Sequence, residues 1–282
     1  MLKTRIYTAA ALLAGVMFLG ALGIAWLVTA AAVFLGVALF EWLRLARVGT
    51  PIAAAAAAIA AAAAWLLDRM GFRPAPAALA AVAGGAVALW FAIAGVLVAA
   101  QRRPADRAMR IPDAISIAAA FALGGAAWLC VARLLHQGAG WTLSVLALVW
   151  LADAAAYFTG RSIGRHKLAS RISPGKTWEG VGGAVVAVAL CAWALRLSSP
   201  GADLWPVALL RATPVGGTAI LVVFVALSVV GDLFESLVKR QAGVKDSGTI
   251  LPGHGGVWDR IDATLPAVAL AVFAQWWLMR VS

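Results

Sequence analysis

Charged residues are scarce in this chain. They make up 12% of its 282 residues, whereas 63% are hydrophobic and the mean hydropathy is +0.93. A soluble domain carries about 25% charged residues, so this composition excludes an ordinary water-soluble protein. Apolar runs long enough to cross roughly 30 Å of hydrocarbon as helices recur along the whole sequence. We therefore predict an all-α, polytopic integral membrane protein.

Cysteine is almost absent as well. The two cysteines, Cys130 and Cys191, both lie inside apolar runs. They show neither the spacing of metal ligands nor a disulfide framework. We expect both to be small side chains within the helix bundle.

The net charge of +11 does not indicate a nucleic-acid partner. Nucleic-acid binding needs a basic face on a soluble module, and no segment of this chain offers one. Basic residues instead concentrate in the loops between apolar runs, as they do in loops that stay cytoplasmic. No nucleic acid is expected among the partners.

Apolar runs between charged, proline or glycine residues predict nine membrane spans. The run from about residue 7 to residue 40 is longer than the roughly 7–15-residue core of a signal peptide. It is expected to be retained as two helices hinged at residues 20–23. Most of the 23 lysines and arginines fall on the side that holds the N-terminus and the loops after spans two, four, six and eight, which predicts a cytoplasmic N-terminus. The spans are expected near 7–22, 24–43, 51–67, 78–100, 113–133, 142–160, 180–197, 216–238 and 263–279.

Polar residues gather in two segments, 153–179 and 232–262. These segments hold four of the five lysines and seven of the 12 acidic residues. We therefore predict an N-terminal scaffold, residues 1–140 with spans one to five, and a catalytic region, residues 141–282 with spans six to nine. The catalytic region is expected to carry cytoplasmic loops at 161–179 and 239–262.

The end of the eighth span places several polar residues on one helical face. They stand at positions i, i+3, i+4, i+7 and i+8, which share a face of an α-helix. Two acids and two bases on one face at a membrane boundary indicate a water-filled cavity. A ladder of ion pairs that joins two helices is the alternative. The residues are Asp232, Glu235, Ser236, Lys239 and Arg240.

The loop that follows combines glycines, donors and carboxylates. Glycines allow backbone N–H groups to turn toward a ligand, and Lys245 and His254 add side-chain donors. Asp259 and Asp262, three residues apart, are expected on one face at the start of the ninth span. Such parts can hold a metal-bound polyphosphate, since Mg²⁺ takes one or two carboxylates together with phosphate oxygens. The glycines are Gly248, Gly253, Gly255 and Gly256.

Residues 236–262 read SLVKRQAGVKDSGTILPGHGGVWDRID. They resemble the signature of the phosphatidate cytidylyltransferase family, S-x-x-K-R-x(4)-K-D followed by H-G-G-x-x-D-R-x-D. Residues 151–180, LADAAAYFTGRSIGRHKLASRISPGKTWEG, are similar to the cytoplasmic stretch of that family. Gly175 stands where the family usually has a lysine, and Ala154 where a threonine or serine often follows the aspartate. The match covers about residues 150–265. The N-terminal half agrees only in hydropathy and in the triplet 40–42, Phe-Glu-Trp.

The resemblance implies that CTP and phosphatidic acid react to form CDP-diacylglycerol and pyrophosphate, with attack of the lipid phosphate on the α-phosphorus of CTP. Such chemistry needs mainly alignment and charge neutralisation. The resemblance implies Mg²⁺ and leaves open a second, monovalent cation. The implied catalytic residues are Lys239, Arg240, Lys245, Asp246 and His254; the substrate-binding residues are Ser173, Lys176, Thr177, Ser236, Gly255, Gly256 and Arg260; the metal ligands are Asp232 and Asp259 first, then Asp262, Glu235 and Asp153.

Several residues carry two interpretations. Asp153 is either a cation ligand or the partner of a basic residue on the eighth span. His166 and Lys167 either contact phosphate or are solvated loop residues, and Glu179 is expected to cap the seventh span.

The expected partners are CTP, phosphatidic acid and the bilayer, with a homodimer implied by the resemblance alone. The location implied is the cell (inner) membrane, with several spans and with the N-terminus and active site cytoplasmic. The alternatives are a cation-coupled transporter and an enzyme that activates another lipid phosphate.

Overall fold

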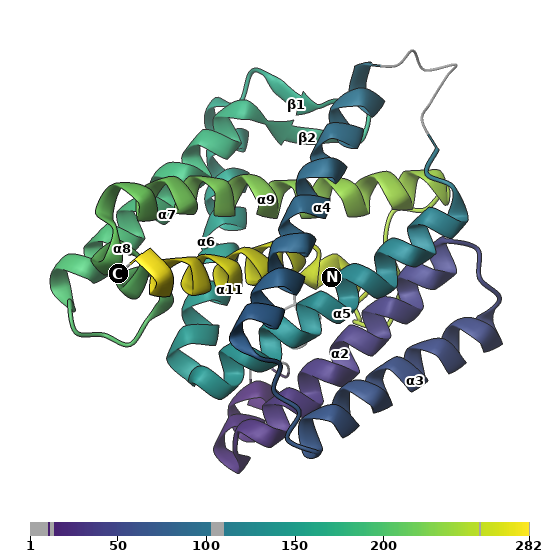
Figure 1. The fold of residues 1–282 in the computed structure, drawn as a ribbon. Coiled ribbons are helices and arrows are strands. Elements are labelled where there is room, and N and C mark those ends of the chain that lie inside the picture. Colours follow the sequence, from purple (N-terminus) through teal and green to yellow (C-terminus); the bar gives the residue numbers. More distant parts are fainter. Residues whose placement is uncertain (1–10, 12–13, 103–109, 254, 282) are drawn as a thin grey trace.

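The computed structural model describes residues 11, 14–102, 110–253 and 255–281 of the chain. These residues form a helix bundle with one small antiparallel hairpin (Figure 1). In chain order the elements are α2 (Ile24–Leu45), α3 (Thr50–Arg69), α4 (Pro76–Arg102), α5 (Asp113–Gln137), α6 (Ala139–Ile163), β1 (Lys167–Ala169), β2 (Ser173–Thr177), α7 (Trp178–Ser198), α8 (Trp205–Ala212), α9 (Pro214–Gln241), α10 (Trp258–Ile261) and α11 (Thr264–Val281).

The all-α, polytopic class is confirmed. Eight stretches of helix in the described part of the chain are long and apolar enough to cross a membrane. They correspond one by one to the expected spans from 24–43 to 263–279. Part of the first expected span, near 7–22, lies outside the described residues, although residues 14–22 are helical. Gly23 interrupts the helix before α2 with a φ of 117°, so the hinge expected at residues 20–23 is confirmed.

The hairpin of β1 and β2 and the short helix α8 were not predicted, and the hairpin positions the site. Strands β1 and β2 pair antiparallel, with Lys167 opposite Thr177 and Ala169 opposite Ser173. Thr177 then caps α7 by accepting a hydrogen bond from the backbone N–H of Gly180 at 3.2 Å. The hairpin therefore brings residues 173–177 against the bundle in a fixed orientation. The other element, α8, is too short to cross a membrane and packs at the opposite end.

The loops that carry the polar segments lie at one end of the bundle. In Figure 1 the hairpin and the C-terminal end of α4 lie at the top, and the C-terminal ends of α2 and α9 lie at the right. The N-terminal ends of α2 and α4, helix α8 and the C-terminal end of α11 lie along the lower left. Successive membrane-spanning helices thus end alternately at the two ends of the bundle. The orientation predicted from the count of lysines and arginines assumes this alternation.

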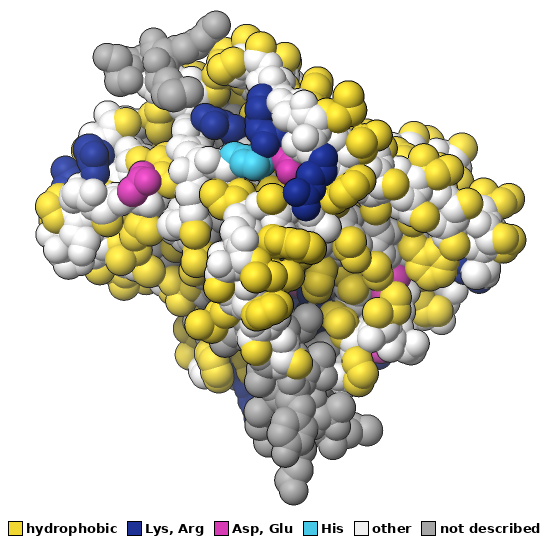
Figure 2. Space-filling view, turned by 90° about the horizontal axis from the view of Figure 1, so that it is seen from below, with side chains coloured by type: hydrophobic (Ala, Val, Ile, Leu, Met, Phe, Trp, Pro, Cys, Tyr) yellow, Lys and Arg dark blue, Asp and Glu magenta, His cyan; other side chains and the backbone are white. Residues whose placement is uncertain are grey.

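The opposite end holds a separate polar cluster. Asp68, at the end of α3, is 8% exposed and accepts a hydrogen bond from Nε2 of His136 at 2.7 Å. Arg73 lies 3.1 Å from the same carboxylate oxygen. Figure 2 shows a histidine among basic and acidic side chains on this end, whose surface is otherwise largely hydrophobic. The cluster ties the end of α3 to the end of α5, far along the bundle from the hairpin.

Aromatic packing joins the two regions expected from the sequence. Trp42 of α2 stacks on Trp258 of α10, with ring centroids 4.2 Å apart and planes 9° from parallel. Phe234 of α9 meets the edges of Trp42 and Trp90, at 5.4 and 5.8 Å. Such pairs stabilise a core by more than their buried area alone. Helices of the expected scaffold therefore pack directly on the helices that carry the polar segments.

Gly231 of α9 lies tightly against the start of α11 and the residues just before it. A Cβ atom there would overlap the carbonyl oxygen of Asp262 and lie 3.0 Å from Cγ of Pro266. We expect Gly231→Ala to destabilise the protein by about 1–3 kcal/mol, because overpacking moves α9 away from α11. The measurement is the thermal unfolding midpoint of the detergent-solubilised protein. Gly182→Ala in α7, where no other described atom lies within 4 Å, is the control and should not lower the midpoint. Equal midpoints for the two variants would contradict the close approach.

Candidate active site

A cavity of about 750 Å³ lies between the hairpin, α6, α7, α9 and α10. It contains polar residues from both segments singled out in the sequence. Gly255 and Gly256 do not line it, and His254 lies outside the described residues. The expected site residues that line it are Asp153, Ser173, Lys176, Thr177, Asp232, Glu235, Ser236, Lys239, Arg240, Lys245, Asp246, Asp259, Arg260 and Asp262.

The cavity reaches from the loops into the membrane-spanning part of the bundle. Its lining on α9 extends back to Ser228, 13 residues before the end of the helix at Gln241. At 1.5 Å per residue the lining residues from Ser228 to Arg240 cover about 18 Å along the helix. Ala184 of α7 and Val229 of α9 give the inner part an apolar wall. The cavity can therefore accommodate a ligand that is polar at one end and apolar at the other.

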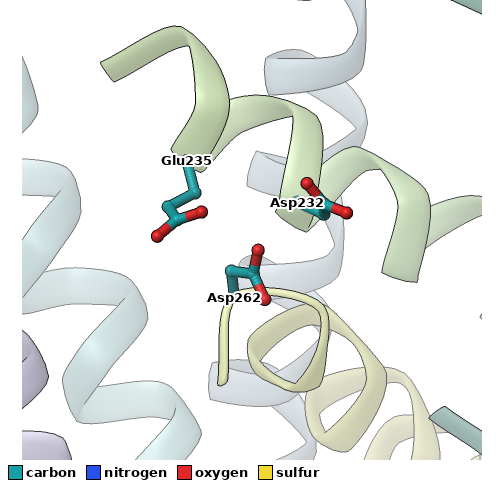
Figure 3. A group of neighbouring side chains, drawn as sticks. All are labelled: Asp232, Glu235 and Asp262. Carbon is teal, nitrogen blue, oxygen red and sulfur yellow. The ribbon is translucent and has the colours of Figure 1, made fainter. Parts of the chain in front are cut away.

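Three carboxylates converge inside the cavity. Asp232 and Glu235 come from one face of α9, and Asp262 follows α10 directly (Figure 3). One oxygen atom from each lies within 4.8 Å of the others. Glu235 is 1% exposed, so its charge is largely removed from water. Like charges at this distance repel one another strongly unless a cation lies between them.

This carboxylate trio, Asp232, Glu235 and Asp262, fits a divalent cation. Oε1 of Glu235 is buried and has no hydrogen-bond partner among the described residues. A buried acceptor without a partner is costly and calls for an unseen ligand. Carboxylate oxygens are the donors that hard cations such as Mg²⁺ prefer. Both the donor set and the unpaired oxygen therefore fit Mg²⁺.

Two lysines hold members of the trio from different elements. Nζ of Lys176, on β2, lies 2.6 Å from Oδ2 of Asp232. Nζ of Lys239 lies 2.6 Å from Oε2 of Glu235 and 2.5 Å from Oδ1 of Asp259. The ion-pair alternative is thus correct in part, because Lys239 joins α9 to α10. The same residues nevertheless line the cavity, as the first interpretation of the helical face predicts.

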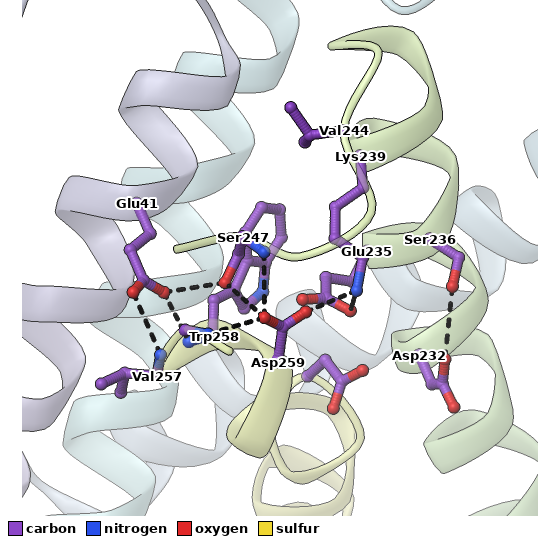
Figure 4. A network of polar contacts seen from close by, with 12 residues as sticks. Glu41, Asp232, Glu235, Ser236, Lys239, Val244, Ser247, Val257, Trp258 and Asp259 are labelled. Carbon is purple, nitrogen blue, oxygen red and sulfur yellow. Dashed lines mark hydrogen bonds and ion pairs between the residues drawn. The ribbon is translucent and has the colours of Figure 1, made fainter. Parts of the chain in front are cut away.

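Asp259, expected as a first-choice metal ligand, lies beside the trio with both of its oxygens in other contacts. Its Oδ2 accepts hydrogen bonds from the backbone N–H groups of Ser247 at 2.9 Å and Gly256 at 2.8 Å, and its Oδ1 meets Lys239 (Figure 4). It is not a member of the trio, and neither is Asp153. Asp262 continues the helical turn of α10, because its N–H donates to the carbonyl of Trp258 at 3.1 Å, and both aspartates line the cavity. The oxygens of Asp259, however, are taken by these other contacts.

Gly256 and Gly255, both expected among the substrate-binding residues, make contacts within the loop. The backbone N–H of Gly256 donates a hydrogen bond to Asp259, and Gly256 is buried. Gly255 has a φ of 81°, which glycine adopts without strain, and its carbonyl accepts a hydrogen bond from Leu251 at 3.0 Å. These two glycines therefore shape the loop, and neither lines the cavity.

Thr177 caps α7, and Glu179, expected as the cap, lies in the first turn of the helix and holds His166. Its carboxylate accepts a hydrogen bond from the backbone N–H of His166 at 3.2 Å and lies 2.6 Å from Nδ1 of the same residue. His166 is thereby held outside the cavity lining, whereas its neighbour Lys167 lines it. Trp178 is 61% exposed at the start of α7, as expected for a side chain at the membrane interface.

Sequence reasoning missed Glu41. It lies in α2, is 2% exposed and accepts hydrogen bonds from residues of the loop before α10. In the sequence, Glu41 was assigned no role beyond its place in the Phe-Glu-Trp triplet at 40–42. The available signal was an acidic residue within an apolar span, because such residues are costly in membranes and mark functional positions.

Comparisons with known proteins agree with this geometry. The chain is similar to the phosphatidate cytidylyltransferases of three bacteria. The enzyme of Haemophilus influenzae is 47% identical over 135 residues, 47% of this chain and 44% of the relative. That of Pseudomonas aeruginosa is 48% identical over 141 residues, 49% of each chain. That of Brucella suis is 50% identical over 140 residues, 46% of this chain and 47% of the relative.

The chain spans about half the length of the curated relatives that it matches. The family model described as "Cytidylyltransferase family" extends much further and matches residues 3–278. That match includes α2 and its Glu41 as well as the trio. The protein belongs to the cytidylyltransferase family.

Proposed function

We propose that this protein is a phosphatidate cytidylyltransferase, which joins CTP to phosphatidic acid and releases pyrophosphate. The observation that carries the proposal is the cavity, in which basic side chains and the carboxylate trio share one space that continues into the membrane-spanning helices. The similarity to bacterial phosphatidate cytidylyltransferases supports the same activity. The proposed location is the cell inner membrane, with the N-terminus and the cavity mouth on the cytoplasmic side.

In this proposal Asp232, Glu235 and Asp262 hold Mg²⁺. When bound, Mg²⁺ supplies neutralisation of the negative charge on the triphosphate and helps to fix its orientation. Asp259 binds no metal. It holds Lys239 and the loop, and so fixes the ammonium group beside the trio.

The basic side chains of the cavity bind the phosphates. Lys176, Lys245 and Arg260 come from β2, the loop and α10, so they surround the space beside the trio from three directions. A non-bridging oxygen of the lipid phosphate attacks the α-phosphorus of CTP. The bond from that phosphorus to the oxygen of the β-phosphate breaks, and pyrophosphate leaves with the electron pair. The apolar inner wall keeps the acyl chains toward the bilayer.

The test is product formation by the purified protein in lipid nanodiscs. We expect labelled CTP, phosphatidic acid and Mg²⁺ to yield CDP-diacylglycerol and an equal amount of pyrophosphate, identified by mass spectrometry. Replacing phosphatidic acid with an isoprenyl phosphate tests activation of another lipid phosphate. A transporter would form no CDP-lipid with either. Absence of product with phosphatidic acid would overturn the proposal.

Lys245→Ala is expected to weaken the use of CTP. Lys245 is exposed at the cavity and acts as a point charge toward phosphate, so its loss should raise the KM for CTP about tenfold, or about 1.4 kcal/mol, with less effect on kcat. The measurement is initial rate against CTP concentration at saturating phosphatidic acid. Arg211→Ala, at the opposite end of the bundle, is the matched charge control. An unchanged KM in Lys245→Ala would remove Lys245 from the nucleotide site.

A further inference from the structure

Glu41 stands in an unusual position for a residue of the expected scaffold. Both of its carboxylate oxygens accept hydrogen bonds from the loop between α9 and α10, residues 242–257, and from the first residue of α10 (Figure 4). Oε1 accepts from the backbone N–H of Val257 at 3.1 Å. Oε2 accepts from the backbone N–H of Trp258 at 2.8 Å and from Oγ of Ser247 at 2.9 Å. An acid in α2 thus satisfies donors more than 200 residues away in the chain.

The 242–257 loop is shaped to enclose this carboxylate. A Cβ atom at Gly248 or at Gly256 would overlap the oxygens of Glu41. Only glycine leaves the required space at these two positions. The glycines of the loop therefore fit around an acidic side chain from α2.

The α2 side of this contact is itself fixed. Trp42, the next residue, stacks on Trp258 at 4.2 Å, and its Nε1 donates to Oγ of Ser116 in α5 at 3.0 Å. Glu41 and Trp42 thus both contact the start of α10 from the side of α2. Glu41 does so by hydrogen bonds, and Trp42 by ring packing. Buried polar contacts that are fully paired favour one conformation of the segment they hold.

Hydrogen bonds continue from Glu41 to the carboxylate trio. Ser247 donates its backbone N–H to Asp259 at 2.9 Å, and its hydroxyl lies 2.9 Å from Glu41 and 3.1 Å from Asp259. A hydroxyl carries a single proton, so it is shared between the two carboxylates. Asp259 in turn meets Lys239, and Lys239 meets Glu235 of the trio. Figure 4 shows this path from α2 to α9.

We propose that Glu41 is a positioning residue: through Ser247 and the amides of Val257 and Trp258 it sets the orientation of the 242–257 loop and of the Asp259–Lys239 pair at the cavity. The proposal rests on the proposed function for its effect on turnover. Its effect on the loop is independent of that function. Glu41 itself does not line the cavity, so it acts through other residues.

The first experiment measures turnover of Glu41→Gln in nanodiscs. Glutamine has one acceptor oxygen, so its NH₂ group would face either Val257 or the two donors at Oε2. We expect kcat to fall about 10–100-fold, the range found when residues that orient ligands are removed. Glu41→Asp, which keeps both oxygens on a shorter side chain, should recover part of the loss. Asp68→Asn is the matched control, because it removes a buried carboxylate at the other end and should leave kcat close to wild type.

The second experiment measures amide hydrogen exchange, which does not depend on activity. Glu41→Gln should speed exchange in peptides that cover residues 247–258 and leave α7 unchanged. Ser247→Ala removes only the shared hydroxyl, so its loss of turnover should be smaller and should not add to that of Glu41→Gln. Faster loop exchange in Glu41→Gln but not in Asp68→Asn supports the positioning role, even if the wild type forms no CDP-lipid. Loop exchange equal to wild type in Glu41→Gln would overturn it, whatever happens to turnover.

Discussion

Asp262→Asn is expected to lower CDP-diacylglycerol formation by about 10²–10³-fold, the loss seen when one preorganised electrostatic contact is removed from a reaction site. The substitution keeps the size of the side chain and removes one of the three negative charges in the trio. The backbone N–H of Ala263 donates a hydrogen bond to Oδ1 of Asp262 at 2.8 Å. The side-chain oxygen of asparagine can still accept this hydrogen bond. The local backbone should therefore persist while cation affinity falls.

Asp232→Asn should cause a loss of the same order for a related reason. It removes a second charge of the trio and also the partner of Lys176, which lies 2.6 Å away. The ammonium group of Lys176 then loses the carboxylate that lies 2.6 Å from it. We therefore expect Asp232→Asn to shift the dependence on both Mg²⁺ and CTP, and Asp262→Asn to shift mainly the dependence on Mg²⁺.

The measurements are initial rate across a Mg²⁺ titration and direct binding of Mn²⁺ by electron paramagnetic resonance. Asp113→Asn is the control, since Asp113 is an exposed acid that pairs with Arg110 at the start of α5. It should bind Mn²⁺ and turn over like wild type. Undiminished Mn²⁺ binding in Asp262→Asn would show that the trio is not the cation site.

The sequence predicted the spans well because their signal is local and strong. A run of apolar residues that ends at a charged residue or proline predicts where a membrane helix begins and ends. The bounds of α4 and α9 agree with this prediction to within a few residues. The hairpin gave no such signal. Its second strand, Ser-Pro-Gly-Lys-Thr at 173–177, lacks the apolar alternation by which strands are recognised. It becomes a strand only by pairing with β1.

The site was predictable where its residues share a continuous helix. Asp232, Glu235 and Lys239 do lie on one face of α9 and do line the cavity. The spacing of Asp259 and Asp262 was also informative, since Asp262 continues the helical turn of α10 and both residues line the cavity. The spacing could not reveal that the oxygens of Asp259 are taken by Ser247, Gly256 and Lys239, because these residues lie in other segments.

The partner of the glycine-rich loop was also out of reach. Glu41 and Ser247 are 206 positions apart, and no pattern in either segment predicts that the two are in contact. Without that partner, the glycines were interpreted as room for a phosphate. The structure shows that two of them, Gly248 and Gly256, leave room for a carboxylate instead. A glycine in a sequence indicates that space is needed at that position, but it does not indicate which group fills the space.

Asp259→Asn is expected to abolish turnover without weakening cation binding. Four donors approach its two oxygens: the amides of Ser247 and Gly256 and the shared hydroxyl of Ser247 at Oδ2, and Lys239 at Oδ1. Asparagine offers an oxygen on one side only, so its NH₂ group faces either the two amides or the ammonium group of Lys239. Leaving a buried donor unpaired costs about 1–3 kcal/mol. The loop then shifts, or Lys239 moves away from Asp259 toward Glu235.

This variant separates the two roles that the sequence could not distinguish. If Asp259 orients Lys239 and the loop, the maximal rate falls at least 100-fold, or about 2.7 kcal/mol, while the Mg²⁺ concentration for half-maximal rate and Mn²⁺ binding stay near wild type. If Asp259 were instead a metal ligand, both would shift as they do in Asp262→Asn. Membrane insertion and the gel-filtration profile show whether the variant is folded. Because Lys239 keeps its contact with Glu235 at 2.6 Å, the charge of the site is not left uncompensated, and a folded, cation-binding protein without turnover is the expected result.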